Sequence, residues 1–250
     1  MASISYKNMP ITAAGQTIYA SSASISQDIS VEAQESLGVR GKSRAYNNAA
    51  PKGQVSFDYY EDGTFSVFEN LTDAQILVIG PYTVTHAYLT SLNFNGEPNA
   101  PISMSQSWDF YGTLTEGAPP SSASASIETY VVNGLSGFDE MGGGQAFSFG
   151  YNSSNAYEVR HLLASVTPIG VFKGAEISLD FEGDELTNAL TSSDSNICIT
   201  AQEGLKLVMR NSCNAAETIT ITVEGHMTSR SVDSAPGDIN KYSLNVVKYL

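Results

Sequence analysis

The sequence predicts a mainly β protein made of two tandem repeats of one β-sandwich or barrel fold, each with a short helix. Charged residues make up only 15% of the 250-residue chain, whereas Ser, Thr, Asn, Gly and Ala are abundant, and this composition favours strands and turns over exposed helices. The stretch KGQVSFDYYEDG (52–63) returns as KGAEISLDFEGDE (173–185). A hairpin pattern follows each of the two stretches, so the order of elements also repeats.

The two related stretches are predicted to be strands that bury the same face. Their lysines are 121 residues apart, close to half of the chain. Apolar side chains alternate with polar ones in both, which is the period of a half-buried strand. The alternating apolar residues are Val55, Phe57 and Tyr59 in the first stretch, and Ile177, Leu179 and Phe181 in the second.

Each strand is followed by a predicted short helix and then by a hairpin. The helices are expected over 63–71 and 183–191, and the hairpins over 87–112 and 205–227. The hairpins turn at Asn95-Gly96 and at 211–217, where turn-forming residues interrupt alternating strands.

The domain organisation is predicted from the composition between these elements. The first repeat is expected over 1–117, with a long polar loop at about 25–51, and the second over 127–250, with a flexible Gly-rich insertion at 133–145. Paired prolines and a run of small residues predict a linker over 118–126.

The net charge of −14 bears on possible partners. A chain this acidic, without a basic stripe, is not expected to bind nucleic acid, because its potential repels phosphate. We found no run approaching a membrane span and no signal-peptide pattern, so we expect a soluble protein made in the cytoplasm, without membrane contact. For the same reason Cys198 and Cys213 are expected to be free thiols.

No catalytic motif is evident, and we expect no enzymatic activity, no cofactor and no metal. The histidines His86, His161 and His226 stand in no metal-binding spacing, and the hydrolase pattern G-x-S-x-G is missing. The acidic stretch 180–185 lacks the twelve-residue pattern of a calcium loop, so we interpret it as a solvated turn.

Aromatic side chains leave a different function open. A carbohydrate-binding or adhesin-like protein of two modules would carry exposed aromatics on a strand face, although strand aromatics more often belong to a core or to cross-strand pairs. The candidates for such a face are Tyr59, Tyr60, Trp108, Phe110 and Tyr111.

The hairpin AYLTSLNFNGEPNAPISMSQSWDFYG (87–112) resembles the long hairpin of bacteriophage tail-tube proteins and related tail or neck structural proteins. The preceding KGQVSFDYY and the predicted helix stand in the order of that fold, a β-sandwich or rolled barrel flanked by one helix. The second copy is looser, because it lacks the Trp and the Tyr-Gly ending.

The resemblance implies a structural virion protein of the tail that forms a tube or a tube-like ring. Rings in this family present six copies of the fold around a channel, so a chain with two copies would close the ring as a homotrimer with pseudo-sixfold symmetry. Its implied partners are copies of itself and other tail proteins, and DNA would pass through the acidic channel without specific binding. A tail hub, a neck ring or a capsid decoration protein are the alternatives that the resemblance leaves open.

A basic cluster in the long polar loop is a candidate contact between stacked rings. Cations that reach the acidic face of the next ring would offset the repulsion between two negative rings. The candidate contact residues are Arg40, Lys42 and Arg44 on the basic side, and Glu61, Asp62, Asp184 and Glu185 on the acidic side.

Overall fold

The computed structural model shows a mainly β protein. It describes residues 10–29, 31–35, 42–47, 51–97, 100–112, 114–118, 130–135, 146–161, 167–183, 205–211, 213–214, 216–237 and 241–250. Within these residues, no helix is of the length and apolar character needed to cross a membrane.

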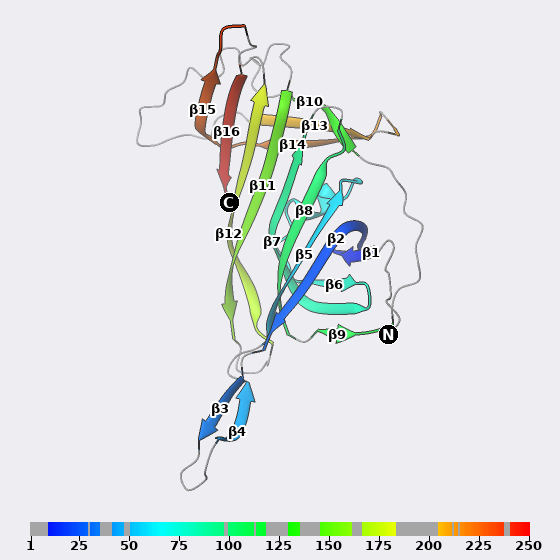
Figure 1. The fold of residues 1–250 in the computed structure, drawn as a ribbon, viewed down its shortest axis with the longest axis vertical. Helices are drawn as coiled ribbons and strands as arrows, with labels where there is room; N and C mark the ends of the chain where they lie inside the picture. Colours follow the sequence, from blue (N-terminus) through cyan, green and yellow to red (C-terminus); the bar gives the residue numbers. More distant parts are fainter. Residues whose placement is uncertain are drawn as a thin grey trace.

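Six strands from the first half of the chain close a barrel (Figure 1). Their order is β7-β6-β1-β2-β5-β8, and β8 pairs again with β7. All of the pairs are antiparallel. The strands are β1 (Pro10–Ala13), β2 (Gln16–Asp28), β5 (Lys52–Tyr60), β6 (Gln75–Ile79), β7 (Tyr82–Gly96) and β8 (Ser103–Tyr111).

Strand β7 extends the sheet beyond the barrel. On one edge its first part pairs with β6, and its last part, 91–96, pairs with β11 (Ala146–Arg160). The sheet then continues through β12 (Ile169–Gly183) and β16 (Lys241–Tyr249) to β15 (His226–Asp233). The result is one continuous antiparallel sheet in the order β2-β5-β8-β7-β11-β12-β16-β15, which we call the long sheet.

Smaller elements flank the long sheet. A three-stranded sheet consists of β10 (Tyr130–Leu135), β13 (Leu205–Asn211) and β14 (Thr218–Val223), and the short β9 (Thr115–Glu116) pairs with β7. A separate hairpin of β3 (Val31–Glu35) and β4 (Lys42–Asn47) projects beyond one end of the barrel (Figure 1).

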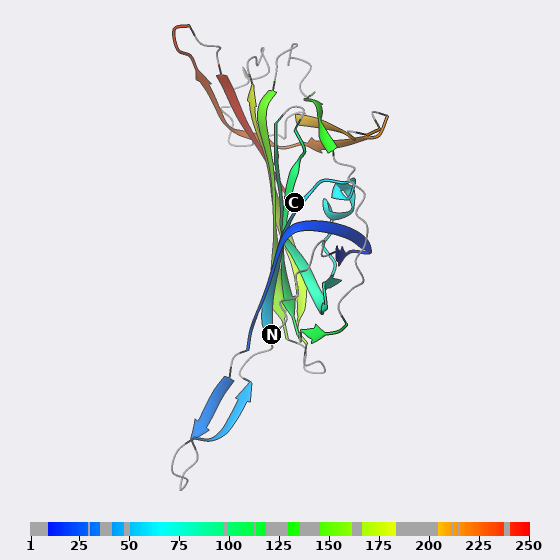
Figure 2. The same ribbon diagram turned by 45° about the vertical axis from the view of Figure 1, so that its right-hand side comes forward.

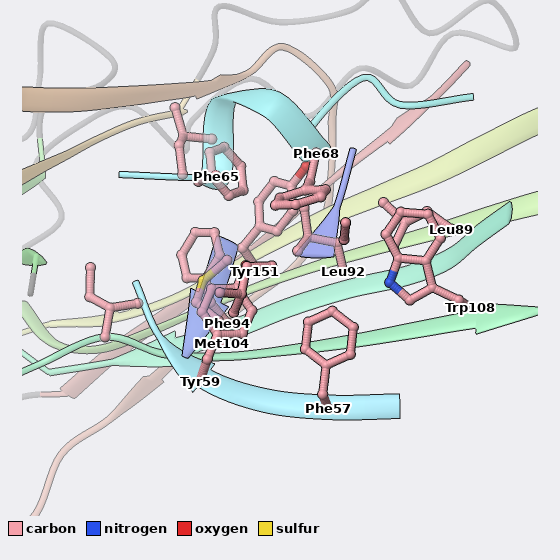
Figure 3. Packing of buried hydrophobic residues seen from close by; sticks show 14 of the residues in the cluster. Phe57, Tyr59, Phe65, Phe68, Leu89, Leu92, Phe94, Met104, Trp108 and Tyr151 are labelled. Carbon is pink, nitrogen blue, oxygen red and sulfur yellow. The ribbon is translucent and has the colours of Figure 1, made fainter. Parts of the chain in front are cut away.

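The core lies on one side of the long sheet. Figure 2 shows the sheet nearly edge-on, with α1 (Phe65–Phe68), β1, β6 and the β13–β14 hairpin all on the same side. Phe65 packs edge-on against Phe94 and Tyr151, and Phe68 packs edge-on against Trp108 (Figure 3). The short helix therefore covers the core on the side opposite the long sheet.

Three buried polar side chains of the barrel satisfy one another. The indole N–H of Trp108 donates to Gln106 Oε1 at 3.0 Å, and Gln106 Nε2 donates to the Tyr59 hydroxyl at 2.7 Å. These three side chains are at most 1% exposed, so the hydrogen bonds remove the cost of burying unpaired polar atoms.

Several predictions from the sequence are confirmed. Both alternating triads are buried, with no member more than 5% exposed. A short helix lies within 63–71. Hairpins form at 87–112 and at 205–227, where β7 pairs with β8 and β13 pairs with β14.

Other predictions differ from the structure. The described residues of the predicted polar loop 25–51 form mainly the end of β2 and the paired strands β3 and β4, the stretch 180–183 continues β12, and the predicted insertion begins as part of β10. The barrel is closed by the first half alone, and two tandem repeats are not shown. The second predicted helix after 183, the linker residues 119–126 and Cys198 lie outside the described residues, while Cys213 is exposed in the turn between β13 and β14.

The predicted correspondence between the hairpins 87–112 and 205–227 is wrong. The β7–β8 hairpin belongs to the long sheet, where β8 pairs with β5. The β13–β14 hairpin pairs with β10 in the three-stranded sheet instead. The two hairpins therefore do not occupy equivalent places.

Candidate functional site

The face of the long sheet that points away from the core is largely polar, except where Tyr88 and Tyr111 pack together beside Asp109 and Lys52. Side chains opposite one another on paired strands share a face, so the register shows which residues lie together. One row runs from β2 to β12 through Ser22, Asp58, Ser105, Asn93, Asn152 and Ser178. A second row runs through Ser24, Ser56, Ser107, Ser91, Ser154 and Glu176.

Hydrogen bonds join neighbouring side chains on this polar face. Ser22 donates to Asp58 at 2.6 Å, and the hydroxyls of Ser24 and Ser56 lie 2.7 Å apart. At the other end, Asn245 on β16 donates to Asp180 on β12 at 2.6 Å. The face is thus a hydrogen-bonded layer of short side chains rather than a surface of long mobile ones.

Carboxylates give the polar face a negative potential. They are contributed by Asp58, Asp109, Glu176, Asp180 and Glu182. Asp109 is paired with Lys52 at 3.0 Å. A shallow hollow of about 480 Å³ lies on this face, where Gly150 has no side chain between Asn95 and Asp180.

The long sheet has two open edges. Beyond its short pairing with β1, strand β2 is paired only with β5, and β15 is paired only with β16, within the described residues. Because eight antiparallel strands alternate in direction, β2 and β15 run in opposite directions. Unpaired strand edges expose N–H and C=O groups that can pair with another chain.

The predicted basic cluster lies partly on the projecting hairpin. Lys42 and Arg44 belong to β4, opposite Glu35 and Gln34 of β3. Arg40 lies outside the described residues, as do the predicted acidic partners Asp184 and Glu185.

Glu61 is buried, in contrast to its predicted place on an outer acidic face. Its side chain is 0% exposed, and its Oε1 atom accepts the backbone N–H groups of Gly63 and Phe65, each at 2.9 Å. Burial raises the pKa of Glu61 to about 7, although these hydrogen bonds act in the opposite direction. The carboxyl group thus holds the turn that leads into α1 and does not face a neighbouring molecule.

Asp62 is partly buried beside Glu61. Burial also raises the pKa of Asp62, and the nearby polar groups of Thr64 oppose that shift. Asp62 is therefore less accessible to a neighbouring molecule than a fully exposed carboxyl group would be.

The aromatic residues do not form an exposed sugar-binding face. Of the five candidates only Tyr60 is exposed, at 55%, whereas the other four are at most 6% exposed. The carbohydrate-binding alternative therefore loses the surface on which it depended.

Within the described residues, no group of three or more His, Cys, Asp and Glu side chains is placed to hold a metal ion. The sequence reasoning also missed the most extensive surface feature, the polar face. Its signal was present in the alternating serines of strands such as β8 (SMSQSWDFY), which predicted a wet face for each strand but not the continuity of these faces from β2 to β12.

The chain matches no protein-family model and no curated protein sequence.

Proposed function

We propose that the protein is a structural subunit of a virion, a phage tail-tube or tube-like ring protein that assembles as a trimer around a channel. The observation that carries the proposal is the long sheet, with its core on one face, a polar acidic surface on the other and two open edges. The resemblance of the 87–112 hairpin to tail-tube proteins supports the same function.

A repeated strand order supports the proposed ring, with a different correspondence from the one that the sequence predicted. The long sheet divides into β2-β5-β8-β7 and β11-β12-β16-β15, two units with the same strand order and directions. The repeated strands β5 and β12 are second in each unit. The connections agree as well, because β1 precedes β2 and pairs with β6, while β10 precedes β11 and pairs with β13.

The repeated Lys-Gly pair strengthens this correspondence. Gly53 lies opposite Phe110, on the strand that follows β5 in its unit. Gly174 approaches the carbonyl oxygen of Leu250, directly after β16, the equivalent strand of the second unit. The glycine is thus placed against the end of the same neighbouring strand in both units.

The open edges provide a way to join subunits. Since β2 and β15 run in opposite directions, β15 of one subunit can pair with β2 of the next in the antiparallel sense that the whole sheet follows. This contact is head-to-tail, so it forms a ring when the rotation between subunits closes after three copies, and such a ring leaves no strand edge open. Three chains then present six four-stranded units around the axis.

The polar face suits the wall of such a channel. If the core side faces outward, the serine, asparagine and carboxylate side chains line the lumen. A negative wall repels phosphate, so DNA passes without being held.

Proline variants of β2 test the ring contact. In an antiparallel pair, alternate backbone N–H groups point to opposite edges, so of Ala23→Pro and Ser24→Pro one removes an N–H from the open edge and the other removes one from the pair with β5. We expect the variant that loses the open-edge N–H to give a folded monomer. The variant that loses the N–H paired with β5 should be destabilised, whereas Ser24→Thr should form rings. Native mass spectrometry and electron microscopy read out the assembly. A wild-type protein that stays monomeric at high concentration would refute the proposal.

The projecting β3–β4 hairpin supports a contact between stacked rings. We expect the change of Arg40, Lys42 and Arg44 to Ser to leave rings intact and to weaken their stacking. Each exposed ion pair contributes only about 0.2–1 kcal/mol, so stacking depends on the sum of the pairs that the three subunits repeat at each interface. Sedimentation at low and high salt measures stacking. Added salt should weaken stacking of the wild type more than that of the variant, and equal stacking of both proteins would exclude the contact.

A further inference from the structure

The segment between β5 and α1 combines buried carboxyl groups with a closing element of the core. Glu61 directly follows β5, and its Oε2 atom is buried without a hydrogen-bond partner among the described residues. Four residues later α1 begins, and its Phe65 and Phe68 side chains are each 1% exposed. The position of α1 over the core is thus tied to the state of one buried carboxyl group.

Two more carboxyl groups flank α1, and one cation faces them in the described part of the chain. Asp62 has a buried Oδ1 atom without a hydrogen-bond partner. Glu69 forms the C-terminal cap of α1, where the helix dipole disfavours a negative charge. Lys248 of β16 is the cation that acts on Glu69, and the phenol of Tyr59 lies near Glu61 and Asp62.

We propose that Glu61–Glu69 is a proton-operated latch, in which protonated carboxyl groups hold α1 over the core and their ionisation releases it. Loss of the proton from Glu61 places a charge where one oxygen has no donor and where Asp62 is the nearest acid. Opening of the segment brings the charge into water, which relieves that cost.

The direction of the pH dependence follows from the shifted pKa values. Burial raises the pKa of Asp62 and of Glu69, and it raises that of Glu61 from 4.5 to about 7. The closed form therefore binds protons more tightly than the open form, and its advantage is complete below about pH 4.5. The advantage is lost as the pH rises through about 7. Glu61 alone would increase the ratio of open to closed segment on the order of 100-fold.

Hydrogen exchange of the full-length protein between pH 5 and 9 tests the latch. The reporters are the amides of Val67, Glu69 and Leu71, which donate to backbone carbonyls within this segment. After correction for the intrinsic pH dependence of exchange, we expect their protection to fall on the order of 100-fold across this range. Amides of the barrel strands should keep their protection, which distinguishes local opening from global unfolding.

Variants separate Glu61 from the other titrating groups. Glu61→Gln keeps an oxygen acceptor for the two N–H groups and should make the protection of α1 nearly independent of pH. Glu176→Gln, on the exposed polar face, should behave like the wild type. If Glu61→Gln does not fold, Asp62→Asn should still reduce the pH dependence. A wild-type protection that does not change with pH, or an unchanged slope in Glu61→Gln, would overturn the proposal.

Discussion

Phe57→Asp and Leu179→Asp are each expected to prevent folding of the half of the chain that carries the change, and to make the protein insoluble. Phe57 is 2% exposed and Leu179 is 0% exposed. Each change removes about 1.5–3 kcal/mol of apolar burial and adds several kcal/mol for a carboxylate without a partner. That loss is comparable to the total stability of a typical domain, about 5–15 kcal/mol. The soluble fraction after expression and circular dichroism of any soluble protein measure the effect.

The matched controls are Ser56→Asp and Ser178→Asp. They place the same carboxylate one residue away, on the polar face of the same strands. These variants should remain soluble and folded. A folded Phe57→Asp or Leu179→Asp protein would mean that the strand does not bury the face that the structure assigns to it.

Gly53→Ala and Gly174→Ala are expected to cost the next largest amount of stability. A Cβ atom at Gly53 would overlap with the Phe110 ring and the carbonyl oxygen of Ser26. A Cβ atom at Gly174 would lie 2.6 Å from the carbonyl oxygen of Leu250, and its φ of +154° also disfavours a side chain. Since backbone atoms block both positions, relief requires movement of a paired strand, with a cost of about 1–3 kcal/mol or more.

Denaturant midpoints measure this second effect. Gln54→Ala, next to Gly53 but on the exposed face, serves as the control and should shift the midpoint little. Equal midpoints for Gly53→Ala and Gln54→Ala would show that the strands around Gly53 are not packed as closely as described.

The sequence predicted local features of the fold correctly because they depend on local patterns. The alternation in KGQVSFDYY and KGAEISLDFE gave the buried face of β5 and of β12, since a strand exposes every second side chain. The turn signal at Asn95-Gly96 gave the β7–β8 hairpin, although both residues still belong to β7 and the turn comes after them. Neither pattern states which sheet a hairpin joins, so the 205–227 hairpin was matched to the wrong partner.

The candidate site was predicted less well, for a different reason. The polar face and its open edges depend on the pairing of β7 with β11, whose residues 91–96 and 149–154 meet although no local signal connects them. Glu61 and Asp62 were predicted to lie on the acidic side of a contact between rings because acidic residues are rarely buried. The structure instead uses a carboxyl oxygen of Glu61 as an acceptor for backbone N–H groups.

The closure of the barrel by the first half alone has a consequence for the order of folding. All six barrel strands lie between Pro10 and Tyr111, so the barrel can close during synthesis before β11 has been made. The second half depends on the first, because β11 pairs with the edge of β7 that the finished barrel presents. We expect the barrel to act as a template on which the later strands are added one by one, ending with β15.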